Sequence, residues 1–202
     1  MIVAGLVILV VAIVGITYAV ITKQGDEGFL KHEGKDIVWD TENFPLICTV
    51  DESVTEGHLA RYMKAKNEIN TQVGKQLLST CVEWAISNTP MPEYIPGALT
   101  VRVSVPKPSE ELIVDDPFSV HPGGITRHQF NKNTGMVISA AVWIDPNNPE
   151  NLVDRIWLHE LGHVLGLAHD RLTNSVMYSK ASDRPSRLSK KDIDLLKKTY
   201  LK

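Results

Sequence analysis

The sequence has little of what a nucleic-acid-binding or repeat protein would show. Its 202 residues carry 21 Lys and Arg against 24 Asp and Glu, for a net charge of −3, and no basic run is longer than a pair. Nucleic-acid binding depends on clustered Lys and Arg that release counterions from phosphates, so we expect no nucleic-acid partner. Internal repeats and low-complexity stretches are absent as well, which excludes a repeat architecture.

Cysteine is also scarce. Cys48 and Cys81 are the only two, and neither lies in a CxxC pair or beside a histidine motif. Two cysteines are consistent with one disulfide in an oxidising compartment, but two unpaired thiols are equally ordinary in a reducing one. The pairing therefore stays open at this point, and we do not expect either cysteine to bind a metal ion.

The N-terminus contains one long uncharged run. Residues 2–22 are dominated by Val, Ile, Leu and Ala, and a helix of about 20 residues at ~1.5 Å per residue crosses a bilayer core of ~30 Å. A secretory signal peptide would begin with basic residues, have a shorter apolar run and end at a small-x-small cleavage site, and this run has none of these. We favour an uncleaved transmembrane helix over a cleaved signal peptide or a buried soluble helix.

The sequence then divides into three parts. Residues 1–23 are predicted to be the anchor, residues 24–36 a linker rich in charge and glycine, and residues 37–202 one domain large enough to bury a core. Lysines follow the anchor while only the α-amine precedes it, which by the positive-inside rule mildly favours a cytoplasmic domain.

The strongest motif is the stretch HELGHVLGLAHD at residues 159–170. His159 and His163 are four residues apart, so on a helix they project from one face and can bind the same metal ion. Glu160, one position further round, stays off the metal and can reach a water beside it. These residue types at this spacing predict a zinc site with a carboxylate base.

A third ligand follows the helix. Gly166 has no Cβ and can adopt the left-handed conformation that ends a helix, which lets the chain turn and bring His169 to the same ion. Three protein ligands leave the fourth position of a tetrahedral zinc ion open. An open position separates a catalytic zinc site from a closed structural one, so we predict one catalytic zinc ion.

A second element supports this interpretation. Met177 lies eight residues after His169, within Ser175-Val176-Met177-Tyr178, and fits the Met-turn that accompanies the extended HExxHxxGxxH motif. With these residues the chain resembles the metzincin proteases, and among them the matrixin-like catalytic domain of matrix metalloproteases. Tyr178 directly after the methionine is typical of matrixins, whereas Asp170 departs from the serine that usually follows the third histidine.

The resemblance implies an α/β (α+β) fold, in which a twisted mixed sheet lies over an active-site helix and a C-terminal helix ends the domain. Residues 124–130 would form the edge strand beside the cleft, where an extended peptide can add as one more strand. Ser189 and Asp192 fit the N-cap and third position of the last helix.

Other histidines carry weaker signals. His121 and His128 resemble in position the second, structural zinc site of matrixins, but the acidic and glycine pattern between them is missing. We therefore expect no second zinc or calcium ion. We expect His128 to face substrate or solvent from the edge strand.

Hydrophobic periodicity and turn residues place the remaining elements. Strands are predicted at residues 44–50, 99–105, 125–130 and 136–144, and helices at residues 55–70, 149–166 and 188–200.

These features together predict a single-pass, membrane-anchored zinc metalloendopeptidase that hydrolyses peptide bonds in proteins or peptides. Glu160 would be the general base and Met177 a packing residue beneath the zinc ion. The alternative is a catalytically silent, membrane-tethered binding or assembly module that keeps the metzincin shell. Metzincins usually act outside the cytoplasm, so we favour an extracytoplasmic domain despite the lysines after the anchor. The oligomeric state is left unpredicted.

Overall fold

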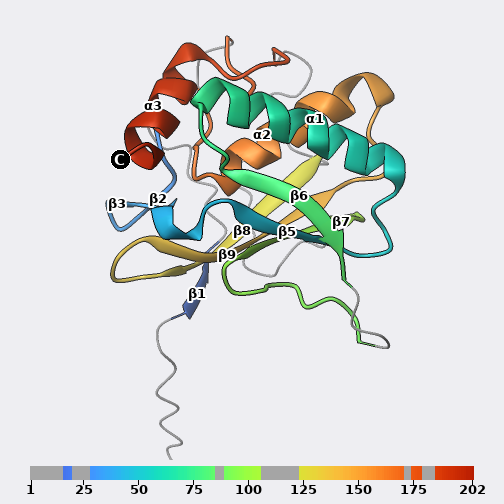
Figure 1. Ribbon diagram of the computed structural model, residues 1–202, viewed down its shortest axis with the longest axis horizontal. Helices are drawn as coiled ribbons and strands as arrows, with labels where there is room; N and C mark the ends of the chain where they lie inside the picture. Colours follow the sequence, from blue (N-terminus) through green and yellow to red (C-terminus); the bar gives the residue numbers. More distant parts are fainter. Residues whose placement is uncertain (1–15, 20–27, 85–88, 106–122, 171–173, 179–184) are drawn as a thin grey trace, which may run out of the picture.

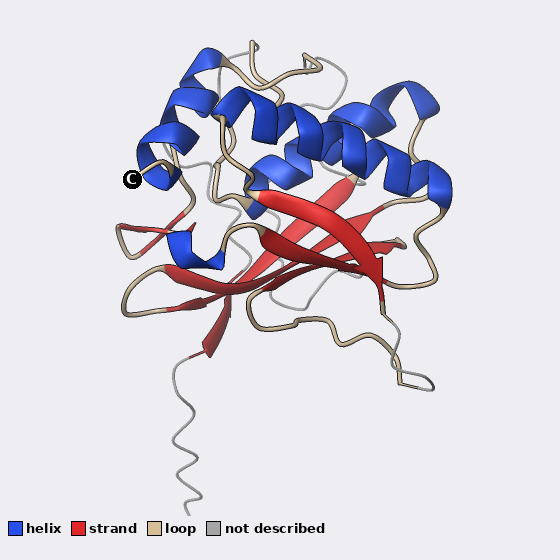
Figure 2. Cartoon of the chain, in the orientation of Figure 1, coloured by secondary structure: helices blue, strands red, loops and turns tan. Residues whose placement is uncertain are grey.

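The computed structural model describes residues 16–19, 28–84, 89–105, 123–170, 174–178 and 185–202. Within them, seven strands form one twisted mixed sheet with helices packed on one face (Figures 1 and 2). The strands are β1 (Ile16–Ala19), β4 (Val38–Trp39), β5 (Leu46–Val50), β6 (Leu78–Glu83), β7 (Ala98–Val103), β8 (Gly124–Asn131) and β9 (Met136–Ile144).

The order across the sheet is β1-β8-β9-β7-β5-β6, and β4 pairs with the start of β9. Strands β4, β5, β6, β7 and β9 pair in parallel, whereas β8 runs antiparallel to β9 and β1 antiparallel to β8. The mixed sheet implied by the family resemblance is therefore confirmed. A short hairpin of β2 (Lys31–His32) and β3 (Lys35–Asp36) lies outside this sheet.

Three α-helices and one 3-10 turn complete the described structure: α1 (Glu56–Val73), α2 (Glu150–Val164), α3 (Lys190–Tyr200) and η1 (Thr41–Asn43). Thr55 caps α1 by accepting a hydrogen bond from the His58 amide, and Gly74 ends that helix with a φ of 80°. A reciprocal capping box of Ser189 and Asp192 starts α3, as predicted.

The core lies between the sheet and the helices. Alternate strand residues such as Leu46, Leu99 and Val101 are buried there against Tyr62 and Ile69 of α1 and apolar residues of α2. This packing holds α2 against strands β8 and β9. The sheet thereby fixes the position of the helix that carries the HExxH motif.

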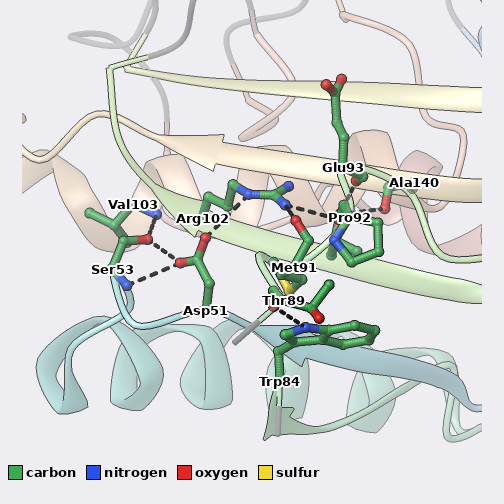
Figure 3. Close-up of polar contacts among 11 residues, drawn as sticks. Asp51, Ser53, Trp84, Thr89, Met91, Pro92, Glu93, Arg102, Val103 and Ala140 are labelled. Atoms are coloured by element: carbon green, nitrogen blue, oxygen red, sulfur yellow. Dashed lines mark hydrogen bonds and ion pairs between the residues drawn. The ribbon is translucent and has the colours of Figure 1, made fainter. Parts of the chain in front are cut away.

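A polar network covers the opposite face of the sheet, as Figure 3 shows. The Arg102 guanidinium pairs with the Asp51 carboxylate at 3.2 Å and also donates to the carbonyls of Met91 and Pro92. The Thr100 hydroxyl donates to the Glu93 carbonyl at 2.6 Å. The chain before β7 therefore lies across this face and shields it from water.

Most predicted elements are confirmed, with boundaries shifted by a few residues. Strand β6 and the β2–β3 hairpin were missed. The β6 residues LSTCVE mix polar and apolar types without clean alternation, because their ladder to β5 buries only some of them. The stretch predicted as linker contains Phe29, which is 5% exposed and belongs to the core.

Of the N-terminal run predicted to be a transmembrane helix, the structure describes only Ile16–Ala19. Within the described part of the chain, none of the helices has the length and apolar character needed to cross a membrane. Ile16–Ala19, inside the predicted anchor, form strand β1 instead of helix and pair with His128–Asn131 of β8. Without β1, backbone groups at this edge of β8 would have no strand partner, and the sequence ITYA is rich in residue types that favour strands. The rest of the predicted anchor lies outside the described residues.

Cys48 and Cys81 form a disulfide. They lie opposite each other on the adjacent parallel strands β5 and β6, so the pairing that the sequence left open follows from strand register. The bridge fastens the outer strand β6 to the rest of the sheet.

Replacing both cysteines by alanine is expected to lower the free energy of unfolding. The bridge closes a sequence separation of 33 residues, for which loop entropy gives about 3–4 kcal/mol. Urea denaturation of the C48A/C81A protein measures the loss, and wild-type protein unfolded under a reductant is the control. Equal midpoints for the oxidised wild type and the variant would contradict the assignment.

Candidate metal centre and active site

Three histidine side chains converge at the end of α2. His159 and His163 project from successive turns of the helix, and His169 comes from the chain that follows it. One ring nitrogen of each lies within 4.8 Å of the others. The Nε2 atom of His159 is 3.0 Å from that of His163 and 3.3 Å from that of His169. The structure thus brings together the three residues singled out in the sequence.

The other ring nitrogens of two of these histidines are held by backbone carbonyls. Nδ1 of His159 lies 2.8 Å from the Val176 carbonyl, and Nδ1 of His163 lies 2.7 Å from the Leu167 carbonyl. A carbonyl only accepts, so each Nδ1 carries the proton and each Nε2 presents a lone pair to the centre. Two facing lone pairs 3.0 Å apart repel unless a cation lies between them.

The spacing fits zinc. Two ligands of a tetrahedral ion with Zn–N bonds of ~2.05 Å lie about 3.3 Å apart, close to the two Nε2 separations seen here. The carbonyl partners of His159 and His163 fix ring orientation and tautomer, which is how second partners of metal-binding histidines usually act. Geometry and donor chemistry therefore both match a zinc ion held by His159, His163 and His169.

Gly166 ends α2 as the sequence predicted. Its φ is 89°, its amide donates to the His163 carbonyl at 2.7 Å, and the Leu167 amide donates to the Gly162 carbonyl at 3.0 Å. These two bonds form a Schellman motif, which closes a helix through a left-handed residue. The turn redirects the chain so that His169 returns to the face of the helix that carries His163.

The last carbonyls of α2 are bonded by residues far away in the sequence. The Trp39 indole donates to the Val164 carbonyl at 2.7 Å, and the Tyr200 hydroxyl donates to the Leu165 carbonyl at 2.9 Å. These carbonyls have no partner within the helix, so without such donors they would be buried unsatisfied. Strand β4 and helix α3 therefore help to fix the end of the helix that carries His159 and His163.

The predicted Met-turn lies directly beneath the histidines. Met177 is fully buried and its sulfur packs against Gly162 of α2, where a larger residue would collide with it. The Ser175 hydroxyl donates to the Asp192 carboxylate at 2.5 Å and accepts from the Met177 amide at 2.9 Å. The start of α3 thus holds the turn whose carbonyl, at Val176, orients His159.

Glu160 lies beside the histidines and is 4% exposed. One of its carboxylate oxygens accepts a hydrogen bond from the Thr126 hydroxyl of β8 at 2.8 Å. Gly124 of the same strand lies so close that an added Cβ would be 2.7 Å from Cγ of Glu160. Strand β8 therefore positions the carboxylate, and a glycine is needed where the two come closest.

The prediction for His128 was wrong. Its side chain is 4% exposed and points under the sheet toward α2, with Nε2 3.3 Å from the Val164 carbonyl. Strand alternation explains the error, because Thr126, His128 and Phe130 share the inner face of β8. Burial lowers the pKa of His128 from 6.5 to about 4. His121 lies outside the described residues.

Comparison with known protein families agrees with this geometry. The family profile described as matrixin matches residues 59–201, a range that includes all three histidines, Glu160 and the Met-turn. The chain belongs to the matrixin family. No curated protein sequence matches the chain significantly. Membership of the matrixins supports a zinc metalloprotease-type function, with proteins or peptides as the class of substrate.

Sequence reasoning missed the residues that position this matrixin site. Thr126, Gly124, Trp39 and Tyr200 have no motif of their own, because their roles arise only when distant segments meet. Asp192 was identified as a helix-capping residue, but its bond to Ser175 was not foreseen. The one available signal was the SxM spacing of the Met-turn, which places a hydroxyl two residues before the methionine.

The buried neutral His128 predicts a pH dependence of stability. In the folded chain its pKa is about 4, while in the unfolded chain it is near 6.5. Between pH 6.5 and about 4, His128 is protonated in the unfolded state but neutral in the folded state. The free energy of unfolding should therefore fall as the pH is lowered through this range, by at most about 3 kcal/mol.

Chemical denaturation of the metal-free protein, with chelator present, measures this fall. His128→Gln keeps a donor to the Val164 carbonyl but does not titrate, so its stability should decline less over the same range. Parallel declines in the two proteins would contradict the proposed role of His128.

Proposed function

We propose that this matrixin is a zinc-dependent endopeptidase in which His159, His163 and His169 bind the metal and Glu160 is the general base. One observation carries the proposal: the Nε2 atom of His159 lies 3.0 and 3.3 Å from those of His163 and His169, and the adjacent residue in the helix, Glu160, is a buried carboxylate. Bound zinc supplies Lewis-acid chemistry, since it polarises a carbonyl and makes a water more acidic.

Glu160 performs the proton transfers. Its carboxylate takes a proton from the attacking water and returns it to the amine that leaves when the peptide bond breaks. The Thr126 hydroxyl donates a hydrogen bond to one carboxylate oxygen and so helps to position the base. Burial beside Gly124 excludes bulk water from this side of Glu160, which strengthens the electrostatic interactions made there.

The edge of β8 is the proposed binding site for substrate. Strand β1 pairs with its second half, His128–Asn131, whereas Gly124 and Thr126 in its first half lie against Glu160. An extended peptide that pairs with this first half as an added strand would bring its carbonyl groups close to the base. Main-chain pairing of this kind requires no particular sequence.

We also propose that residues 2–22 anchor the protein in a membrane as a single-pass segment and that the domain lies outside the cytoplasm. The uncharged run supports the anchor, and the Cys48–Cys81 disulfide supports an oxidising compartment. Full insertion of this run as a helix requires that Ile16–Ala19 leave the edge of β8.

Glu160→Gln is expected to abolish most peptidase activity while zinc binding is retained. The amide cannot accept the proton, and general-base catalysis contributes about 10²-fold or more. Cleavage of a denatured protein substrate and metal content after dialysis are the two measurements. His169→Ala is the contrasting variant, because it should lower zinc content as well as activity.

Near wild-type turnover in Glu160→Gln would refute its role as the base. Wild-type protein that binds zinc but cleaves no denatured protein or peptide would instead favour the silent binding module.

Retention in membranes tests the anchor. The full chain is expected to stay in the membrane fraction through high salt and alkaline carbonate, which remove proteins held only by surface charge. A chain that lacks residues 2–22 is the matched control and should be released. Release of the full-length chain by carbonate, or a mature N-terminus after residue 20 in its measured mass, would refute an uncleaved anchor.

A further inference from the structure

The chain that precedes the hairpin bonds directly to the loop between the second and third histidines. The Leu30 amide donates to the Gly166 carbonyl at 2.7 Å, and the Ala168 amide donates to the Gly28 carbonyl at 2.9 Å. Between these bonds Phe29 and Leu167 form an isolated antiparallel bridge. Residues 28–30, here called the N-terminal clamp, thus fasten residues 166–168 along their whole length.

Side-chain packing strengthens this contact. Phe29 is 5% exposed and meets the ring of Tyr200 edge to face, with centroids 6.4 Å apart. Gly166 lies between the Phe29 ring and the Ile37 carbonyl, and a Cβ at position 166 would collide with that carbonyl. Gly166 is therefore required twice, for its left-handed conformation and for this close approach.

The clamped loop controls two of the three histidines. The Leu167 carbonyl accepts the proton of Nδ1 of His163 at 2.7 Å, so the position of Leu167 sets the orientation of that ring. His169 directly follows Ala168, and on its other side the Asp170 amide donates to the Met177 carbonyl at 2.9 Å. The backbone of His169 is thus held between the N-terminal clamp and the Met-turn.

We propose that residues 28–30 are positioning residues of the metal centre, which hold His163 and His169 in their zinc-binding geometry through the Gly166–Leu167–Ala168 backbone. This inference rests on the proposed zinc site and deepens it. The N-terminal clamp lies before the range that matches the matrixin profile and within the stretch that the sequence assigned to a linker. Any processing that releases the domain from a membrane must therefore cut before Gly28 to preserve the metal centre.

Two substitutions at one position in the full chain test the role of the clamp. Leu30→Pro removes the amide that bonds the Gly166 carbonyl, whereas Leu30→Ala shortens the side chain and keeps that amide. Loss of a group that orients metal ligands usually lowers metal affinity 10- to 100-fold. We expect the zinc dissociation constant, measured by competition with a chelator, to rise about tenfold in Leu30→Pro and less than threefold in Leu30→Ala.

Cobalt substitution separates positioning from general stability. A purely structural role would lower the unfolding midpoint of the metal-free protein and leave the visible spectrum of bound cobalt unchanged. A positioning role should change that spectrum in Leu30→Pro, because it reports the number and geometry of the ligands. Equal zinc affinity and identical cobalt spectra in the two variants would overturn the inference.

A second pair decides the question if Leu30→Pro does not fold. Phe29→Ala removes the ring packed against Gly166, and Phe29→Leu restores most of its volume. Weaker zinc binding in the alanine variant with recovery in the leucine variant supports the inference, and equal binding in both overturns it. A wild-type chain that binds zinc but cleaves no peptide would refute the endopeptidase proposal and leave the positioning role of residues 28–30 intact. The comparison of zinc affinities does not depend on activity.

Discussion

The site depends on how helix α2 ends. The last carbonyls of any helix have no partner within it, and here they lie inside the protein where water cannot reach them. Trp39, Tyr200 and Leu30 each donate to one of the carbonyls of residues 164–166. Strand β4, helix α3 and the N-terminal clamp are therefore all tied to the point at which the chain turns from the second histidine toward the third.

This constraint explains why a site of three histidines needs so much of the domain around it. Backbone carbonyls orient two of the three histidine rings. The Val176 carbonyl orients His159, and the Leu167 carbonyl orients His163. A carbonyl orients a ring only as well as its own peptide is fixed. The Ser175–Asp192 bond fixes the first peptide and the N-terminal clamp the second.

Strand β8 connects the sheet to the chemistry. Its inner face places Thr126 against Glu160 and buries His128 under the end of α2, while its edge is the surface that we propose for the peptide substrate. The last four residues of β8, His128–Asn131, are paired along that edge with Ile16–Ala19 of the same chain. Ile16–Ala19 thus have two alternative environments, the sheet edge and, in our proposal, a bilayer.

The three converging histidines, Glu160, the Gly166 turn, the Met-turn and most helices and strands could be predicted from the sequence alone, because each of these depends on spacing within a few residues. The Schellman turn and the α3 capping box follow from local hydrogen bonds that the sequence encodes directly.

The remaining features arise only from packing between distant segments. Four features each join segments that are far apart in the sequence: the Cys48–Cys81 pair, the inward orientation of His128, the strand at Ile16–Ala19 and the contact of residues 28–30 with residues 166–168. These contacts result from strand register and from the hydrogen-bond partners that buried carbonyls require. Both are set only when the sheet and the helices pack together.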